Sequence, residues 1–296
     1  MVRSRSSSKK ILKKKGRITP PGLFWPVIAL GIIGAIVTLL YLLPLPFRLP
    51  FEEFDSAPPI VRPSEPSRPE SSAPMPLVAI LIDDMGNNFR INNDFLKLDA
   101  PLSFSFLPTA PYTPKLAKRA KDLGKDVLIH LPLEPINSMI DPGPGVLRLS
   151  MDFDSMLQVL RKDLDAVPGA IGVNNHMGSK FTTSQRGMEL ILTEIKRRGL
   201  FFVDSKTTHD SVAYVTARSM GIPAAERAVF LDHDNKKESI RREIKKMVKL
   251  SVDNGCVLAI GHPTSNTWRV LSEELPVVRK SASIVPVHKI LIGRQN

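Results

Sequence analysis

Residues 78–88 read VAILIDDMGNN, a run of five apolar residues followed directly by two adjacent aspartates, Asp83 and Asp84. A short apolar run of this kind is typical of a strand that is buried on both faces of a parallel sheet. Two adjacent carboxylates resist burial unless a cation or hydrogen bonds compensate their charge. The stretch therefore predicts a central strand with a chemical site at its end. The alternative is a pair of loop aspartates, one of which caps the next helix.

The same kind of apolar run recurs along the chain and alternates with helix-like segments. The strand-like runs are 78–82, 102–106, 126–131, 170–174, 200–203, 228–231, 257–260 and 284–287. The helix-like segments are 115–123, 154–167, 185–198 and 236–253. This alternation predicts an α/β fold with a mostly parallel sheet covered by helices, either doubly wound or closed. Seven or eight units within 77–296 favour a (β/α) barrel.

Polar residues gather directly after these runs, at the strand ends where parallel α/β proteins carry their chemistry. Five of the six histidines lie at or near such positions or in the following loops. The residues concerned are Asp83, Asp84, His130, Glu134, Asn174, Asn175, His176, Asp204, Ser205, Asp232, His233, Asp234 and His262. His209, His233 and His288 are expected to be structural or peripheral, with His288 in the last strand. The strand-end placement predicts one shared site.

One aspartate and two histidines from neighbouring strand ends suit a divalent metal. Asp84, His130 and His176 would supply one carboxylate and two imidazoles, a set that binds zinc with an open position. Manganese, cobalt or nickel accepts the same ligands. Asp83 would then act as the base. Each histidine also has a plainer interpretation, as a hydrogen-bonded core residue for His130 or a loop-orienting residue for His176.

Seven strings together resemble the divergent polysaccharide deacetylase family, a distant branch of the NodB-type carbohydrate esterases. They are VAILIDDMGNN, LSFSFLP, VLIHLPLEP, GVNNHMGSKFT, FFVDSKT, VFLDHDN and AIGHP. The resemblance extends over about 78–291. It implies an irregular (β/α) barrel of about seven strands, and a metal-dependent hydrolase that removes acetyl groups from a polysaccharide or peptidoglycan-type glycan.

The resemblance also implies roles for particular residues. Asp83 matches the catalytic base and Asp84 a metal ligand, while His262 matches the late histidine that protonates the leaving group. Asp204 is expected to orient His262. The family's His-x-x-x-His motif reads here as His130-Leu-Pro-Leu-Glu134, so either Glu134 or His176 completes the ligand set.

The Arg-x-Pro-Tyr motif of the better-known branch is absent, and residues 174–179 (NNHMGS) stand in its place. These departures leave a second hypothesis open. The chain would then be an inactive or weakly active deacetylase-fold protein that binds glycan or scaffolds an envelope assembly.

The net charge of +12 is concentrated at the N-terminus. Residues 1–20 hold eight Lys and Arg and no acidic residue, which leaves +4 for the rest of the chain. Residues 24–43 (FWPVIALGIIGAIVTLLYLL) carry no charge and are long enough to cross a bilayer. A cleaved signal peptide would have a shorter apolar region and small residues at its end. We therefore expect a single membrane anchor.

The anchor sets the expected placement of the segments on either side of it. Residues 1–23 become a basic cytoplasmic tail, by the positive-inside rule. Residues 44–76 contain ten prolines and predict a disordered linker. The domain at 77–296 is then expected on the periplasmic side of a bacterial inner membrane. The charge indicates topology and lipid headgroups rather than nucleic acid. A single cysteine, Cys256, excludes an intramolecular disulfide.

Overall fold

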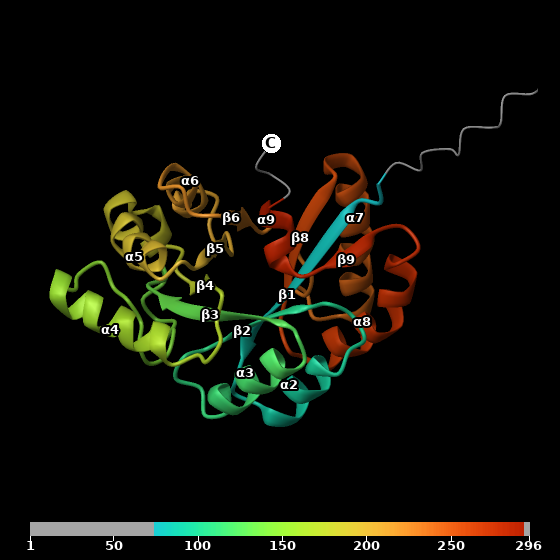
Figure 1. Cartoon of the computed structure of the whole chain (residues 1–296), viewed down its shortest axis with the longest axis horizontal. Coiled ribbons are helices and arrows are strands. Elements are labelled where there is room, and N and C mark those ends of the chain that lie inside the picture. Colours follow the sequence, from blue (N-terminus) through green and yellow to red (C-terminus); the bar gives the residue numbers. More distant parts are fainter. Residues whose placement is uncertain (1–73, 293–296) are drawn as a thin grey trace, which may run out of the picture. The chain divides into compact units, whose positions relative to one another are not determined.

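The computed structural model describes residues 74–292, and these form one all-parallel sheet with helices between successive strands (Figure 1). The sheet order is β6-β5-β4-β3-β2-β1-β8-β7, with β9 paired to the first part of β1. The strands are β1 (Leu77–Met85), β2 (Ser103–Phe106), β3 (Asp126–Leu133), β4 (Gly172–Met177), β5 (Phe201–Asp204), β6 (Ala224–Glu226), β7 (Val229–Phe230), β8 (Cys256–Gly261) and β9 (Ser283–Val285).

A helix follows each strand except β6, which leads directly into β7. They are α2 (Phe89–Leu96), α3 (Thr113–Asp122), α4 (Phe153–Asp165), α5 (Gln185–Arg197), α6 (Ala213–Ser219), α7 (Lys237–Asn254), α8 (Ser265–Val278) and α9 (Val287–Ile292). Side-chain caps fix several starts: Asn88 begins α2, Ser184 begins α5 and Thr264 begins α8, each accepting hydrogen bonds from backbone N–H groups of the first turn. The α/β class predicted from the sequence is confirmed.

One extended segment links the two edges of the curled sheet. Residues 224–226 form β6 and pair with β5, whereas residues 229–230 form β7 and pair with β8. The residues between them continue this bridge, because Arg227 donates its backbone N–H to Asp204 and Ala228 donates to Leu258. The sheet is therefore a curled half-barrel, and a single short segment supplies both of its edge strands.

The sheet has two apolar faces, because successive strand residues point to opposite sides. The outer face packs against the helices and forms the larger cluster, which includes Ile80, Ile82, Phe104 and Phe202. The inner face forms a second cluster with α9 packed into it, made of Ala79, Leu81, Leu128, Phe201, Val203, Ala225, Leu258, Ile260, Val287, Ile290 and Leu291. The amino-terminal half of the barrel interior is thus filled by apolar side chains, and the carboxyl-terminal half is left for polar ones.

A buried carboxylate holds α9 in this position. Asp126 accepts hydrogen bonds from the backbone N–H of His288 at 3.0 Å and lies 2.8 Å from its Nδ1 atom. Ser103 donates to Asp126 and accepts from the Val287 N–H. The strand predicted at 284–287 is present as β9 but ends at Val285, and the prediction that His288 lies in the last strand is wrong, because His288 belongs to α9.

The structure differs from the sequence prediction at other elements too. The short strand β6 and the helices α2, α6 and α8 were not expected. Five predicted strands (β1, β3, β4, β5 and β8) also end later than expected, so that β1 includes Asp83 and Asp84, and β4 includes His176. The predicted tail, membrane anchor and linker lie outside the described residues. Between residues 74 and 292, no helix combines the length and apolar character needed to cross a membrane.

Candidate active site

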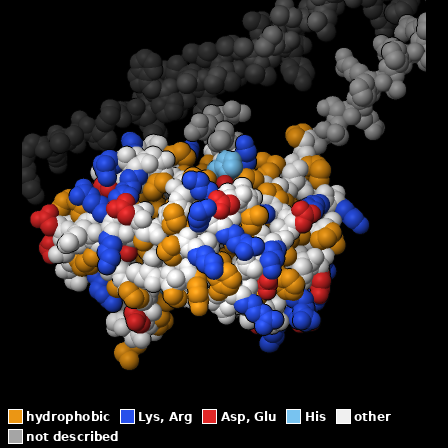
Figure 2. Space-filling model, turned by 60° about the horizontal axis from the view of Figure 1, so that its bottom comes forward, with side chains coloured by type: hydrophobic (Ala, Val, Ile, Leu, Met, Phe, Trp, Pro, Cys, Tyr) orange, Lys and Arg blue, Asp and Glu red, His pale blue; other side chains and the backbone are white. Residues whose placement is uncertain are grey.

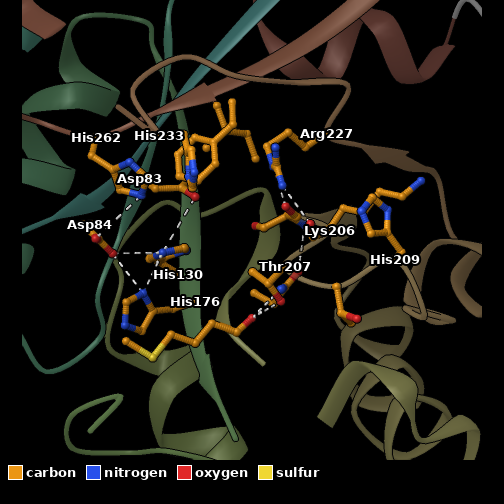
Figure 3. Close-up of a pocket in the computed structure, with 16 residues that line it drawn as sticks. Asp83, Asp84, His130, His176, Lys206, Thr207, His209, Arg227, His233 and His262 are labelled. Carbon is orange, nitrogen blue, oxygen red and sulfur yellow. Dashed lines mark hydrogen bonds and ion pairs between the residues drawn. The ribbon is translucent and has the colours of Figure 1, made fainter. Parts of the chain in front are cut away.

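A pocket of about 550 Å³ opens at the carboxyl ends of the strands (Figure 3). The sequence analysis gave a catalytic or metal-binding role to six residues. Five of them line the pocket, namely Asp83, Asp84, His130, His176 and His262, and Asp204 does not. A second pocket of about 440 Å³ shares Asp84 and His176 with the first and extends toward residues 141–144. The two pockets therefore meet at these two residues. The face shown in Figure 2 carries Lys and Arg side chains interspersed with Asp and Glu.

An irregular backbone lets both adjacent aspartates face the pocket. On a regular strand Asp83 and Asp84 would point to opposite sides of the sheet. The pairing of β1 with β2 shifts register between Ile82 and Met85, and Asp84 adopts a left-handed backbone conformation with φ of 51°. Gly86 follows with φ of 118°, and a side chain there would collide with Thr113. The turn after β1 thus presents two carboxylates to one cavity.

Backbone strain recurs at two other strand ends around the pocket. Met177 follows His176 with φ of 53°, and Lys206 follows Ser205 with φ of 48°. In residues 74–292 these two and Asp84 are the non-glycine residues with positive φ, and all three line the pocket. Strained backbone of this kind persists where the surrounding structure holds it, and it clusters at functional sites.

Three potential ligand atoms form a compact triangle at one corner of the pocket. Asp84 Oδ1 lies 3.1 Å from His130 Nε2 and 3.0 Å from His176 Nδ1, and the two nitrogens are 3.1 Å apart. Ligand atoms about 3.3 Å apart are expected around a tetrahedral ion with bonds near 2.0 Å. The three residues predicted as metal ligands are therefore brought together, and their atoms have the spacing that a zinc-sized cation requires.

The charge of this corner also fits a cation. Asp84 Oδ1 is buried and accepts no well-aligned hydrogen bond. Burial opposes ionisation, but the contacts with His130 and His176 outweigh it and hold the pKa of Asp84 well below its usual range. Burial likewise opposes charge on His130, yet Asp83 and Asp84 raise its pKa. The corner attracts positive charge, which a proton or a divalent metal supplies, so the residues present fit a metal.

Asn174 organises the buried side of the site. Its Nδ2 group donates to both carboxylate oxygens of Asp83, at 3.0 and 3.1 Å, and to Ser205 Oγ at 3.0 Å. Its Oδ1 atom accepts from Ser105 and lies 3.1 Å from His130 Nδ1. Because Oδ1 can only accept, His130 carries a proton on Nδ1, and its Nε2 atom is the one that faces Asp84. A hydrogen bond of this kind to the other ring nitrogen orients a metal-ligating histidine.

Asp83 has the properties of a general base. Its side chain is only 2% exposed, and burial raises its pKa, although His130 and His262 oppose that shift. A carboxylate with a raised pKa accepts a proton more readily near neutral pH. Asp83 Oδ2 lies 3.8 Å from His130 Nε2, so the base adjoins the ligand triangle.

His262 lines the same pocket as the base and is oriented by a buried carboxylate. Asp232 Oδ1 is 2.9 Å from His262 Nδ1, and Asp232 Oδ2 accepts the His262 backbone N–H at 2.7 Å. Burial alone would lower the pKa of His262, but the hydrogen bond and charge of Asp232 raise it to about 9, with support from Asp83 and Asp84. His262 thus holds a proton near neutral pH, and its Nε2 faces Asp84 Oδ2 at 3.9 Å.

The prediction that Asp204 orients His262 is wrong. Asp204 accepts the Lys206 N–H at 2.8 Å, the Ser211 hydroxyl at 2.7 Å and the Tyr214 N–H at 3.3 Å. It therefore secures the loop after β5 and the start of α6. The orienting residue is Asp232, which the sequence places in the strand-end string LDHDN.

Glu134 is not part of the ligand triangle. Its carboxylate accepts the Leu149 N–H at 2.9 Å and the Lys180 ammonium at 2.8 Å, so it ties the loop after β3 to the segment after β4. Of the two alternatives left open by the sequence, the geometry therefore selects His176. Sequence reasoning missed Arg227 and Phe230, which also line the pocket and follow no strand-end pattern. His209 and His233, expected to be peripheral, are exposed residues of the pocket wall.

The fold and the site together define a class of protein: a curled, parallel α/β half-barrel with an Asp–His–His corner at its strand ends. A family model described as divergent polysaccharide deacetylase matches residues 80–291, and the chain belongs to this family.

Two relatives and one solved structure are similar to this chain. The chain is 33% identical to the uncharacterized protein YibQ of Escherichia coli K12 over 72% of this chain and 67% of that one. It is 34% identical to an uncharacterized protein of Haemophilus influenzae over 67% and 70% of the two chains. The crystal structure of an uncharacterized protein from Agrobacterium tumefaciens C58 has a TM-score of 0.70 at 22% identity, covering 75% of this chain and 92% of that one. The structural match shows the fold.

Proposed function

We propose that this protein is a metal-dependent hydrolase that removes an acetyl group from an envelope polysaccharide. The observation that carries the proposal is that a buried carboxylate and a protonated imidazole both adjoin the triangle formed by Asp84, His130 and His176. Asp83 Oδ2 lies 3.8 Å from His130 Nε2, and His262 Nε2 lies 3.9 Å from Asp84 Oδ2. Acetyl transfer to water needs these three elements: a base, an acid and an electrophilic centre between them. Membership of the family supports an acetylated glycan as the substrate.

The roles of the residues follow from their positions. Asp84, His130 and His176 would hold a divalent metal, for which zinc is our preferred candidate, and the metal would polarise the acyl carbonyl and acidify a water molecule. Asp83 accepts a proton from the water that attacks the acyl carbon. His262 donates its Nε2 proton to the departing nitrogen or oxygen as the bond to the acyl carbon breaks. The products are acetate and a free amine or hydroxyl on the sugar.

Positioning residues keep these groups in place. Asn174 donates to Asp83 and orients His130, so it fixes the base and one ligand with the same amide. Asp232 holds the imidazole of His262 with Nε2 turned toward the pocket and keeps it protonated. Preorganised hydrogen bonds of this kind remove the cost of reorientation during the reaction.

The proposal is tested by measuring acetate release by the full-length protein, purified in detergent and loaded with Zn²⁺, Mn²⁺ or Co²⁺. Acetylated glucosamine oligomers and intact peptidoglycan serve as substrates. We expect acetate release that Asp83→Asn and His262→Gln each reduce by about 10²–10⁴-fold. The exposed variant Asp210→Asn is the matched control. Absence of acetate from every substrate with each metal, together with retained glycan binding, would instead support the inactive glycan-binding protein.

We further propose that residues 24–43 anchor the chain in the inner membrane and place the domain in the periplasm. The uncharged run of 20 residues directly after a basic segment supports this topology. A reporter that is active only in the periplasm, fused after residue 296, should be active in the full chain. Activity of a cytoplasmic reporter at the same position would contradict the orientation.

A further inference from the structure

Arg227 lies in the wall of the main pocket on the far side from the Asp84 corner (Figure 3). It belongs to the short segment that bridges β5 and β8. Its Nε and Nη2 atoms donate to the backbone oxygens of Ser205, at 2.6 Å, and Lys206, at 2.7 Å. A guanidinium has five N–H donors in a planar fork, and these two contacts leave three of them free. The carbonyl contacts therefore fix the plane of the group without using its full capacity.

Arg227 forms no ion pair with any of the described acidic residues. Among residues 74–292, no carboxylate oxygen lies within 4 Å of its guanidinium, whereas Lys206 beside it pairs with Glu226 at 2.8 Å. Burial lowers the pKa of Arg227, although the charges of Asp83 and Asp204, which form no ion pair with it, oppose that shift. A half-buried arginine in this position is costly unless an anion pairs with it for part of the time.

Phe230 connects this arginine to the reacting groups. The Arg227 guanidinium carbon lies 4.7 Å from the centre of the Phe230 ring, and the His262 ring centre lies 5.2 Å from it. The arginine and the proposed acid therefore contact the same aromatic ring. A sugar whose acetyl group reaches the Asp84 corner would place its other substituents over this ring, and a neighbouring substituent would face the guanidinium.

We propose that Arg227 is a specificity-determining residue that binds an anionic substituent, a carboxylate or a phosphate, on the glycan whose acetyl group occupies the Asp84 corner. The inference rests on the proposed function, because it names the substrate class of the same pocket. Arginine suits this role, since its fixed planar donors match carboxylate and phosphate oxygens better than a lysine does. The preferred substrate is then a negatively charged acetylated sugar rather than a neutral one.

Binding of matched ligands to the full-length protein tests the proposal. One pair is the disaccharide of N-acetylglucosamine and N-acetylmuramic acid, compared with the same disaccharide after reduction of its carboxyl group to an alcohol. The second pair is N-acetylglucosamine 6-phosphate and N-acetylglucosamine. We expect at least one anionic ligand to bind about 10–100-fold more tightly than its neutral partner. The pair that shows the preference identifies the carboxylate or the phosphate as the source.

Variants separate recognition from structural support. Arg227→Gln should abolish the preference for the anion and leave the affinity for the neutral partner within about twofold, while Arg227→Lys should retain part of the preference. Arg218→Gln, the same change at an exposed position on α6, should leave the preference intact. Equal affinities for both members of each pair in the wild type would overturn the proposal. The proposal would also be overturned if Arg227→Gln, with an unchanged melting temperature, weakened the binding of neutral and anionic ligands equally.

This readout does not depend on turnover. Acetate release without any preference for anionic ligands would overturn the role of Arg227 and leave the proposed activity standing. A clear preference that Arg227→Gln removes, in a protein that releases no acetate, would contradict the proposed activity and support the anionic site.

Discussion

Asp232 contacts His262 twice, with Oδ1 at 2.9 Å from the ring nitrogen Nδ1 and Oδ2 at 2.7 Å from the backbone nitrogen. Thr267 donates a third hydrogen bond to the same carboxylate at 2.7 Å. The carboxylate is fully buried, so its charge acts on the imidazole with little screening. His262 therefore has one defined ring orientation and holds a proton that faces the substrate pocket.

Removal of this carboxylate should reduce turnover more than substrate binding. We predict that Asp232→Asn lowers kcat about 10–100-fold and changes KM less than threefold, because the imidazole loses its orientation and its retained proton. Steady-state acetate release measures both constants. Asp204→Asn is the informative comparison: it should lower the melting temperature, through the loop after β5, and leave kcat within about threefold. A larger loss of kcat in Asp204→Asn than in Asp232→Asn would contradict the structural assignment.

Metal binding should depend on His176 and not on Glu134. A metal that binds only the folded chain stabilises it by about 2.7 kcal/mol at a concentration one hundred times its Kd. We therefore predict that Zn²⁺ raises the melting temperature of the full-length protein by about 5–10 °C, and that a chelator reverses the shift. His176→Ala should remove this shift, whereas Glu134→Gln should retain it. The reverse pattern would show that Glu134 is the third ligand.

We predict that Asn174→Ala lowers both the stability of the protein and its affinity for the metal, because Asn174 contacts both Asp83 and His130. Asn174→Ala leaves Asp83 and Ser205 without their shared donor, and a buried polar group without a partner costs about 1–3 kcal/mol. The variant also removes the acceptor that His130 Nδ1 contacts. Loss of such a hydrogen bond to a metal-ligating histidine weakens metal affinity about 10–100-fold. Chemical denaturation and equilibrium dialysis with Zn²⁺ measure the two effects. Ser105→Ala, which removes one partner of the same amide but leaves its contacts to Asp83 and His130, should show a smaller loss of metal affinity.

Local sequence patterns predicted much of the fold and the ligand triangle. Apolar runs marked the strands, and polar residues after them shared one edge because parallel strands all end there. Asp84, His130 and His176 were therefore predictable as neighbours. The helix after β9 was not predicted, because the apolar run at 284–287 is typical of a strand. The helix from Val287 onward packs Val287, Ile290 and Leu291 into the inner apolar face of the sheet, a contact that the local sequence does not indicate.

The partner of His262 required the strand order, which a single sequence does not contain. His262 follows β8, and β8 pairs with β7 and β1. Asp232 follows β7, whereas Asp204 ends β5 on the other side of the bridging segment. Both aspartates follow strands, so the local pattern is the same for each. The left-handed conformation of Asp84 was equally inaccessible, since it depends on the register shift between β1 and β2.

A buried carboxylate outside the site should make stability depend on pH. Asp163 in α4 is 1% exposed, and its Oδ2 atom has no hydrogen-bond partner. It faces the backbone of Gly145, where an added side-chain carbon would lie 2.7 Å from Oδ2. Burial raises the pKa of Asp163 from 3.8 to about 7, with Lys162 opposing the shift. The folded protein therefore holds this proton more tightly than the unfolded chain does.

The sign of the pH effect follows from this difference. Below pH 3.8 Asp163 is protonated in both states and imposes no penalty, whereas between 3.8 and about 7 the unfolded chain releases the proton first and stability falls. The Asp163→Asn variant has no ionisable group at this position and therefore carries no such penalty. We predict that this variant is more stable than the wild type by about 1–3 kcal/mol above pH 7, and that the gain shrinks steadily toward pH 4. Urea denaturation of both proteins across this range measures the difference, and a gain that stays constant with pH would show that Asp163 is not the titrating group.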